Sequence, residues 1–148
     1  MSGRGFLHSD RDVEAAILEV IERFRTGWEK LDAAQILSTI AQRDDMVMYG
    51  TDLAERWIGY DALVEPTEAM VRAFRNLVYR WGKGEPRVWA RGDVGWACGD
   101  LLTSFEVGGE LLSVIMRTTF VIVREGPEWK IAHAHFSIGQ EEAIAGYG

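Results

Sequence analysis

The sequence is poor in the features that mark secreted, membrane-spanning and disulfide-stabilised proteins. Its 148 residues include a single cysteine, Cys98, which excludes an intramolecular disulfide and indicates a reducing compartment. No apolar run approaches the roughly 20 residues that a membrane-spanning helix needs. Residues 1–8 have no basic start, long apolar stretch or small-residue cleavage site, so they do not resemble a secretory signal. These absences predict a cytoplasmic protein with no membrane partner.

Basic residues and metal ligands are also scarce. The chain has 16 lysines and arginines against 23 acidic residues, a formal net charge of −7, and no basic cluster that could neutralise phosphates. We therefore expect no nucleic-acid partner. His133 and His135 have no obvious third ligand, because the one cysteine is distant and His8 lies in a predicted tail. The sequence thus predicts neither a metal nor a cofactor.

The residues that are present indicate one folded domain. Hydrophobic residues make up 47% of the chain and charged residues 26%, which is ordinary for a soluble globular domain with a buried core. No repeat, linker or low-complexity segment divides the sequence. We predict a single domain over residues 1–148, with an ordered core of about 10–139 and a frayed tail over Gln140–Gly148.

The first half of the sequence has the periodicity of helices. Apolar residues at spacings of three, four and seven predict an amphipathic helix over Asp12–Lys30. Asp32 is suited to cap a short second helix that continues to about Ala41, so the two helices form a hairpin. Pro66 suits the first turn of a third helix, which extends to about residue 77.

Beyond residue 77, apolar runs alternate with glycine-containing turns, a pattern typical of antiparallel strands. The expected strands are Val78–Trp81, Pro86–Arg91, Val94–Val107, Glu110–Arg124 and Glu128–Ile138. A short strand is also expected over Asp45–Gly50, followed by a loop over Thr51–Gly59. The two long strands around Gly108–Gly109 must twist strongly. The sequence therefore predicts an α+β fold in which N-terminal helices pack on a strongly curved antiparallel sheet and leave a cavity.

Two segments of the sequence resemble a known family. Residues 50–59, GTDLAERWIG, resemble the Gly-Thr-Asp, Glu, Trp and Gly pattern that follows the first strand in SnoaL-like proteins. Residues 117–119, RTT, and 129–137, WKIAHAHFS, resemble the last two strands of these proteins and are also similar to the association domain of calcium/calmodulin-dependent protein kinase. The resemblance implies the cone-shaped fold of the nuclear transport factor two-like superfamily, with one pocket and frequent homodimers paired through the sheet. It implies no particular activity, because this fold hosts isomerases, cyclases, dehydratases, hydrolases and assembly domains.

The last predicted strand carries two histidines on one face. Strict alternation places His133 and His135 on the same side as Trp129, Ile131 and Ser137. Both histidines are candidate catalytic and ligand-binding residues if this face lines the pocket. On the alternative interpretation they are hydrogen-bonded residues of the sheet face that pairs with a second copy.

Other candidate residues come from the two matching segments. Arg117 interrupts an apolar strand, so we expect its charge to be paired with Glu55 or Asp100, or to bind a ligand. Trp57 and Glu55 lie in the predicted loop, where we expect Trp57 at the pocket and Glu55 either as a cap or ion-pair partner or as a ligand contact. The remaining candidates are Tyr49 and Thr119 as ligand contacts and Asp52 as a catalytic residue.

Three functions are compatible with this set of residues. The first is a SnoaL-like domain that binds a small, mostly apolar molecule in the pocket of a homodimer. The second is an isomerase, cyclase or hydratase in which His133 or His135 is the base and Arg117 stabilises negative charge. In this enzyme Asp52 or Glu55 has an orienting role. The third is a non-catalytic assembly module. Ketosteroid-isomerase-like relatives carry a catalytic carboxylate at the position of Gly50, and its absence here favours binding over that chemistry.

Overall fold

Two helices form a hairpin at the start of the structure, a computed structural model that describes residues 8–139. Helix α1 (Arg11–Glu29) packs its apolar side inward, and helix α2 (Ala33–Ser38) follows the N-cap residue Asp32, whose carboxylate accepts a hydrogen bond from the first turn. Both predicted helices are confirmed. The second is shorter than expected, because residues 39–41 instead exchange backbone hydrogen bonds with Ile131 of the last strand.

Helix α3 (Tyr60–Ala73) differs from its prediction at both ends. It begins directly after Gly59, so Pro66 lies in the middle of the helix and not in its first turn. It ends before residue 77 because strand β3 begins with Arg75 and continues to Trp81. Leu77 fits both the helical and the strand spacing, so periodicity alone cannot place this boundary. Within residues 8–139, no helix is long and apolar enough to cross a membrane.

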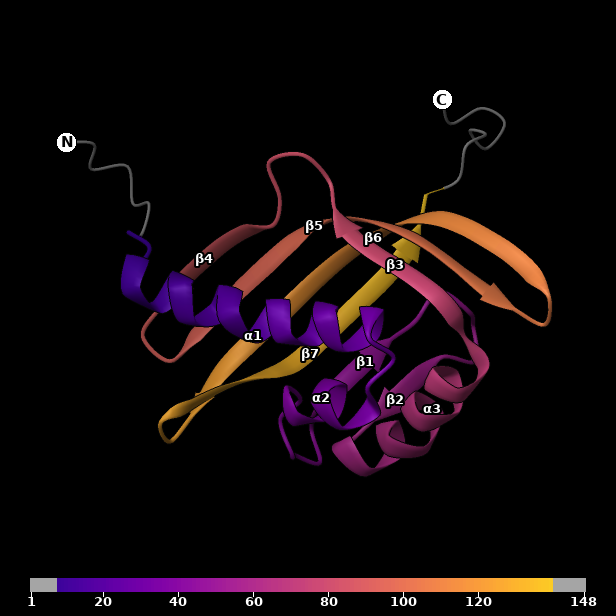
Figure 1. The fold of residues 1–148 in the computed structure, drawn as a ribbon. Coiled ribbons are helices and arrows are strands. Elements are labelled where there is room, and N and C mark those ends of the chain that lie inside the picture. The colour runs from indigo at the N-terminus through magenta and orange to yellow at the C-terminus, as the bar shows by residue number, and fades with distance from the viewer. Residues whose placement is uncertain (1–7, 140–148) are drawn as a thin grey trace, which may run out of the picture.

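A seven-stranded sheet forms the second layer of the molecule (Figure 1). Its strands in spatial order are β2 (Arg56–Ile58), β1 (Val47–Tyr49), β7 (Glu128–Ile138), β6 (Glu110–Glu125), β5 (Val94–Val107) and β3, with β4 (Arg87–Arg91) also paired to β5. The pair β1–β7 is parallel and the other pairs are antiparallel, so the sheet is mixed and not wholly antiparallel as predicted. Strand β2 lies in the segment that was predicted as a loop. The prediction missed this strand because three residues are too few to show a periodic signal.

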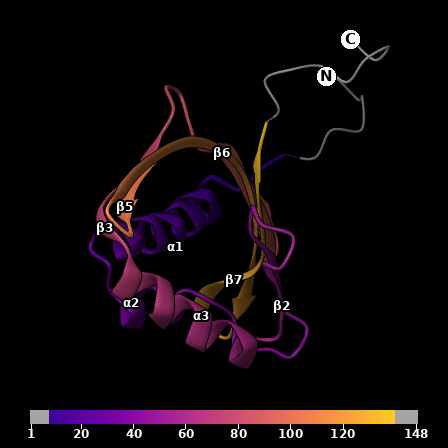
Figure 2. The same cartoon turned by 90° about the vertical axis from the view of Figure 1, so that its right-hand side faces the viewer.

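The sheet curves around α1 (Figure 2). Strands β5 and β6 are 14 and 16 residues long and are joined by the predicted turn at Gly108–Gly109. Paired strands of this length coil strongly. Figure 2 shows the long strands arching over α1, with α2 and α3 at the bottom of the view. This arrangement confirms the α+β fold with N-terminal helices on a strongly curved sheet.

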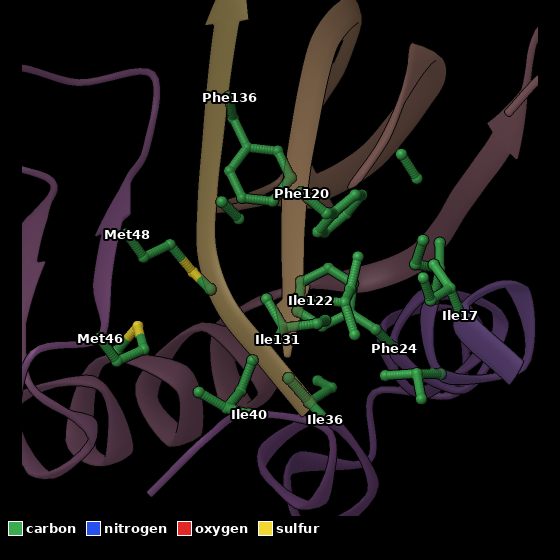
Figure 3. Close-up of a cluster of buried hydrophobic side chains, with 14 of the residues drawn as sticks. Ile17, Phe24, Ile36, Ile40, Met46, Met48, Phe120, Ile122, Ile131 and Phe136 are labelled. Atoms are coloured by element: carbon green, nitrogen blue, oxygen red, sulfur yellow. The ribbon is translucent and has the colours of Figure 1, made fainter. Parts of the chain in front are cut away.

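The core lies between α1 and the concave face of the sheet (Figure 3). The ring of Phe24 from α1 meets Phe120 of β6 edge to face, with centroids 5.4 Å apart, and stacks against Phe136 of β7. Fully buried isoleucines surround these rings, and burying each large apolar side chain contributes about 1.5–3 kcal/mol. This packing fixes which face of the sheet lies inward and which side chains can reach an internal cavity.

A β-bulge in β7 changes the predicted faces of that strand. His133 pairs with Val121 of β6, whereas Ile131 pairs with the next residue of β6, so Ala132 has no partner there. Ile131 therefore points inward and is fully buried, on the same side as Phe136. The prediction that Ile131 and His133 share a face is wrong, because strict alternation does not allow for the extra residue.

Candidate functional site

A cavity of about 190 Å³ lies between the concave face of the sheet and the helices. Side chains from all three helices and from most strands line it, among them Met48 of β1, Leu63 and Met70 of α3, and Phe136 of β7. Figure 3 shows Met48 and Phe136 pointing into the molecule from adjacent strands. The lining also includes the exposed Thr51, so the cavity reaches the surface at the β1–β2 connection. A sheltered and mostly apolar space of this kind suits a small molecule.

Aromatic rings form much of the cavity wall. They belong to Phe24, Trp28, Trp57, Phe74, Tyr79, Phe105 and Phe136. Trp57 lies on the inner side of β2, paired with Met48 of β1. Burial raises the pKa of the Tyr79 hydroxyl, so this group stays protonated. Among the described residues Tyr79 is hydrogen-bonded only through its backbone, which leaves its hydroxyl free to bond a ligand.

Glu55 places a carboxylate at the mouth of the cavity. Its Oε1 accepts a hydrogen bond from Asp52 N at 2.8 Å, and Gly50 N donates to the Glu55 carbonyl at 2.8 Å. A Cβ added to Gly50 would lie 2.7 Å from Glu55 Oε1, so only glycine leaves room for this side chain. The position at which ketosteroid-isomerase-like relatives were expected to carry a carboxylate has no side chain, but the carboxyl group of Glu55 lies beside it.

The two histidines lie on the other face of the sheet. Neither His133 nor His135 lines the inner cavity, and both border an open hollow on the outer face together with Cys98 and Arg117. His133 Nδ1 is 2.8 Å from the carbonyl oxygen of Val47 and must donate this hydrogen bond, since a carbonyl only accepts. Of the two alternatives left open by the sequence, the histidines therefore do not take the position at the inner cavity, and the mechanism that uses them as the base there fails.

Tyr49, Thr119 and Arg117 belong to the same outer face. Strand pairing aligns Tyr49 with His135 and His135 with Thr119, and the Tyr49 and His135 rings are 5.3 Å apart. Arg117 is opposite Asp100 on β5, yet within the described residues it forms no ion pair. Of the predicted ligand contacts, only Glu55 and Trp57 therefore line the cavity.

Asp52 supports the β1–β2 connection and does not line the cavity. Its carboxylate accepts a hydrogen bond from Ala54 N at 2.8 Å, and the residue is exposed. A bond from an aspartate to the backbone two residues later is typical of turns. The candidate catalytic role of Asp52 therefore has no support from its position. Within residues 8–139, no group of three histidine, cysteine or acidic side chains could hold a metal ion.

Three buried polar residues of the cavity wall were not predicted. Thr67 of α3, Tyr79 of β3 and Thr103 of β5 each interrupt the apolar inner face of their element. A polar residue on an apolar face is the signal that could have identified them, because buried polar groups need partners. Thr67 Oγ1 donates to the Leu63 carbonyl and Thr103 Oγ1 to the Leu101 carbonyl. Of these three buried hydroxyl groups, only that of Tyr79 has no hydrogen bond within the described structure.

Several solved structures share this fold. An NTF2-like protein of unknown function from Pseudomonas putida KT2440 has 23% sequence identity and a TM-score of 0.75, and the match covers 95% of this chain and 99% of that chain. An NTF2-like superfamily protein from Salmonella enterica serovar Typhimurium has 16% identity and a TM-score of 0.81, covering 93% and 99%. A ketosteroid isomerase-like protein from Erwinia carotovora has 15% identity and a TM-score of 0.73, covering 88% and 99%. At these identities the similarity shows the fold alone.

The family follows from the sequence match. No curated protein matches the chain. The SnoaL-like domain family matches it over residues 17–141, which includes α2, α3 and all seven strands. Because this match spans most of the sequence, and the structure has the corresponding helices on a curved sheet, the protein belongs to the SnoaL-like domain family.

Proposed function

We propose that the protein binds a compact, mostly apolar small molecule in the inner cavity. The observation that carries this proposal is the cavity of about 190 Å³ with walls of aromatic and methionine side chains. An engineered apolar cavity of about 150 Å³ is sufficient to bind benzene. A ligand of one or two rings fits the space, and the Tyr79 hydroxyl and the Glu55 carboxylate supply its polar contacts.

A cavity-filling substitution tests this proposal. Met70 lines the cavity from α3, whereas the neighbouring Ala69 is exposed on the same helix and does not line it. In calorimetric titration we expect indole to bind the wild type and the Ala69→Trp variant. We expect no binding of indole to Met70→Trp, because the new ring occupies the cavity. Thermal melts of both variants check that they are folded. Equal binding of indole by the two variants, or no binding by the wild type, would contradict the proposal.

We further propose that the protein is a homodimer paired through the outer face of the sheet. Trp96, Leu102 and Ile115 are exposed apolar residues of this face, with 44%, 46% and 53% of their surfaces accessible. The hollow bordered by His133 and Arg117 lies on the same face. We assign these two residues to contacts with the second copy, which for His133 is the pairing alternative considered from the sequence.

A second candidate function is proton transfer at a carbon atom, with Glu55 as the base. The observation that favours it is the carboxyl group of Glu55 beside Gly50, at the edge of an apolar cavity. In such a site a carboxylate can remove a proton next to a carbonyl and return it elsewhere, and the Tyr79 hydroxyl can donate to the carbonyl oxygen. Conversion of cyclohex-3-enone to its conjugated isomer, followed by ultraviolet absorbance, tests this function. Equal rates for the wild type and Glu55→Gln would exclude Glu55 as the base.

A further inference from the structure

We propose that the inner cavity selects an organic cation, a molecule of one or two rings that carries a protonated amine. This inference rests on the proposed function, since it names the class of ligand for the same cavity. The starting observation is an imbalance of charge. Glu55 is the one acidic side chain in the cavity lining, and no lysine, arginine or histidine of the described structure contributes to that lining.

Glu55 satisfies only part of its hydrogen-bonding capacity within the protein. Oε1 accepts the bond from Asp52 N, whereas Oε2 has no hydrogen-bond partner among residues 8–139. The ion pairs of this part of the chain do not include Glu55 either. The Asp52 amide holds the carboxylate in place, and the missing side chain at Gly50 leaves room for it, so the second oxygen is available.

The free-energy cost of burying the Glu55 carboxylate under a ligand depends on the chemistry of that ligand. A ligand in the cavity removes water from Glu55, and a buried carboxylate oxygen without a partner costs free energy. A neutral apolar ligand leaves that cost in place, and an anionic ligand adds repulsion. An ammonium group removes the cost, because its N–H donates a charge-assisted hydrogen bond to Oε2.

The aromatic walls favour the same class of ligand. Trp28, Trp57 and Phe74 line the cavity, and Phe74 packs against Phe105 with ring centroids 4.5 Å apart. The faces of aromatic rings are electronegative and attract cations. The net charge of −7 also attracts cations over a longer range. A metal ion does not fit the described site, because no second or third acidic or histidine ligand accompanies Glu55 in the lining.

Three ligands of similar shape test the inference at pH 7: 2-phenylethylamine, 2-phenylethanol and phenylacetate. Their dissociation constants are measured by calorimetry with the wild type, Glu55→Gln and Glu68→Gln. Glu55→Gln keeps an oxygen that can accept from Asp52 N, removes the charge and replaces the second oxygen by an NH2 donor. Glu68 is exposed on α3 and does not line the cavity, so its variant controls for net charge.

We expect the wild type and Glu68→Gln to bind the amine about tenfold more tightly than the alcohol, and phenylacetate most weakly. In Glu55→Gln the preference for the amine should fall to less than about twofold. Binding of the alcohol as tightly as the amine would overturn the inference and leave the proposed function standing. Retention of the amine preference in Glu55→Gln would do the same. No binding of any of the three ligands would overturn both.

Discussion

Arg25 connects the polar side of α1 to the edge strand β3. Its guanidinium donates to Glu22 Oε2 at 3.0 Å, to Glu29 Oε1 at 2.9 Å and to the Tyr79 carbonyl at 2.8 Å. Glu29 in turn accepts from Tyr79 N at 3.0 Å, and Glu22 accepts from Trp81 Nε1 at 3.0 Å. Burial tends to lower the pKa of Arg25, but the bonds and charges of Glu22 and Glu29 outweigh it and raise the pKa. These bonds hold β3, and therefore Tyr79, in place beside the cavity.

Loss of this network should destabilise the fold. Arg25→Met leaves two partly buried carboxylates without their cation, and we expect a loss of about 2 kcal/mol in the free energy of unfolding. This value is below the 3–5 kcal/mol of a fully buried pair because solvent screens the glutamates. Urea unfolding measures it, with Arg23→Met as the control, since Arg23 is exposed and its side chain bonds only Ser38 among residues 8–139. An equal loss in both variants would contradict the assigned role.

Because the Tyr79 hydroxyl is buried, we expect the folded protein to lose stability at alkaline pH. Burial raises the pKa of this hydroxyl in the folded state above the ordinary value of 10.0, which applies in the unfolded chain. The contribution to stability is complete below that value. It declines as pH rises further, because the unfolded chain releases a proton that the folded state retains.

The comparison of the wild type with Tyr79→Phe isolates this effect. Above pH 10 the free energy of unfolding of the wild type should fall faster than that of the variant, by up to about 1.4 kcal/mol per pH unit. All other groups are common to the two proteins, so the difference between the curves reports on Tyr79. Parallel curves from urea unfolding at several pH values would show that Tyr79 is not buried as described.

The contact of α1 with β5 depends on the absence of a side chain at Gly95. A Cβ added there would overlap Ile17 Cδ1 and lie 2.7 Å from the carbonyl oxygen of Trp89. The isoleucine can shift, but the backbone oxygen of β4 cannot move without disturbing its pairing with β5. The approach of the helix to the sheet, and hence the depth of the core, is therefore set at this position.

Gly95→Ala should consequently destabilise the protein by about 1–3 kcal/mol, the usual cost of overpacking. Gly139→Ala is the matched control, because the nearest atom to its added Cβ is 3.7 Å away. Denaturant unfolding of the two variants gives the comparison. If Gly95→Ala unfolds at the same denaturant concentration as the wild type, the close packing of α1 on β5 is refuted.

At the scale of elements, the sequence predicts well where periodicity and turns are unambiguous. The bounds of β5 and β7 match the predicted strands Val94–Val107 and Glu128–Ile138, because glycines mark the turns on either side. Strand β2 and the bulge at Ala132 were missed, since neither a three-residue strand nor one unpaired residue changes the pattern detectably. The bulge matters most for the site, because it places Ile131 and the two histidines on opposite faces of the sheet.

Which residues line the candidate site depends on how the sheet curves over the helices, and no local sequence pattern contains this information. Glu55 and Trp57 were predicted because they stand in a segment with a family resemblance. Met70 was not, because it belongs to an ordinary apolar face of its helix. Tyr79 was not, because a single polar residue on an apolar strand face does not show what it meets once the sheet curves around α1. Four of the predicted ligand contacts, Arg117, Thr119, His133 and His135, do lie together, but on the outer face of the sheet and not at the inner cavity.

In the whole molecule, the two faces of the curved sheet differ in what they bury and expose. The concave face holds the core and the cavity, whereas the outer face exposes Val94, Trp96, Leu102 and Ile115. Exposed apolar residues gathered on one face mark sites of protein association. This asymmetry supports a second copy on the outer face and a small molecule inside.

Disruption of the outer face should therefore separate the copies without affecting the cavity. We expect the wild type to sediment as a dimer at micromolar concentration and Ile115→Asp as a monomer, because a charge would be buried in the interface. Leu53→Asp is the control, since Leu53 is exposed in the β1–β2 connection and lies outside the outer-face group. A monomeric wild type, or a dimeric Ile115→Asp, would contradict the proposed pairing.

We propose that the functional site is the inner cavity and not the hollow on the outer face. A crystal structure of the wild type soaked with indole distinguishes the two places. We expect density for the indole ring in contact with Trp57 and Phe136, beneath Glu55. Density for indole only in the hollow between His133 and Arg117, or an inner cavity filled by protein side chains, would contradict it.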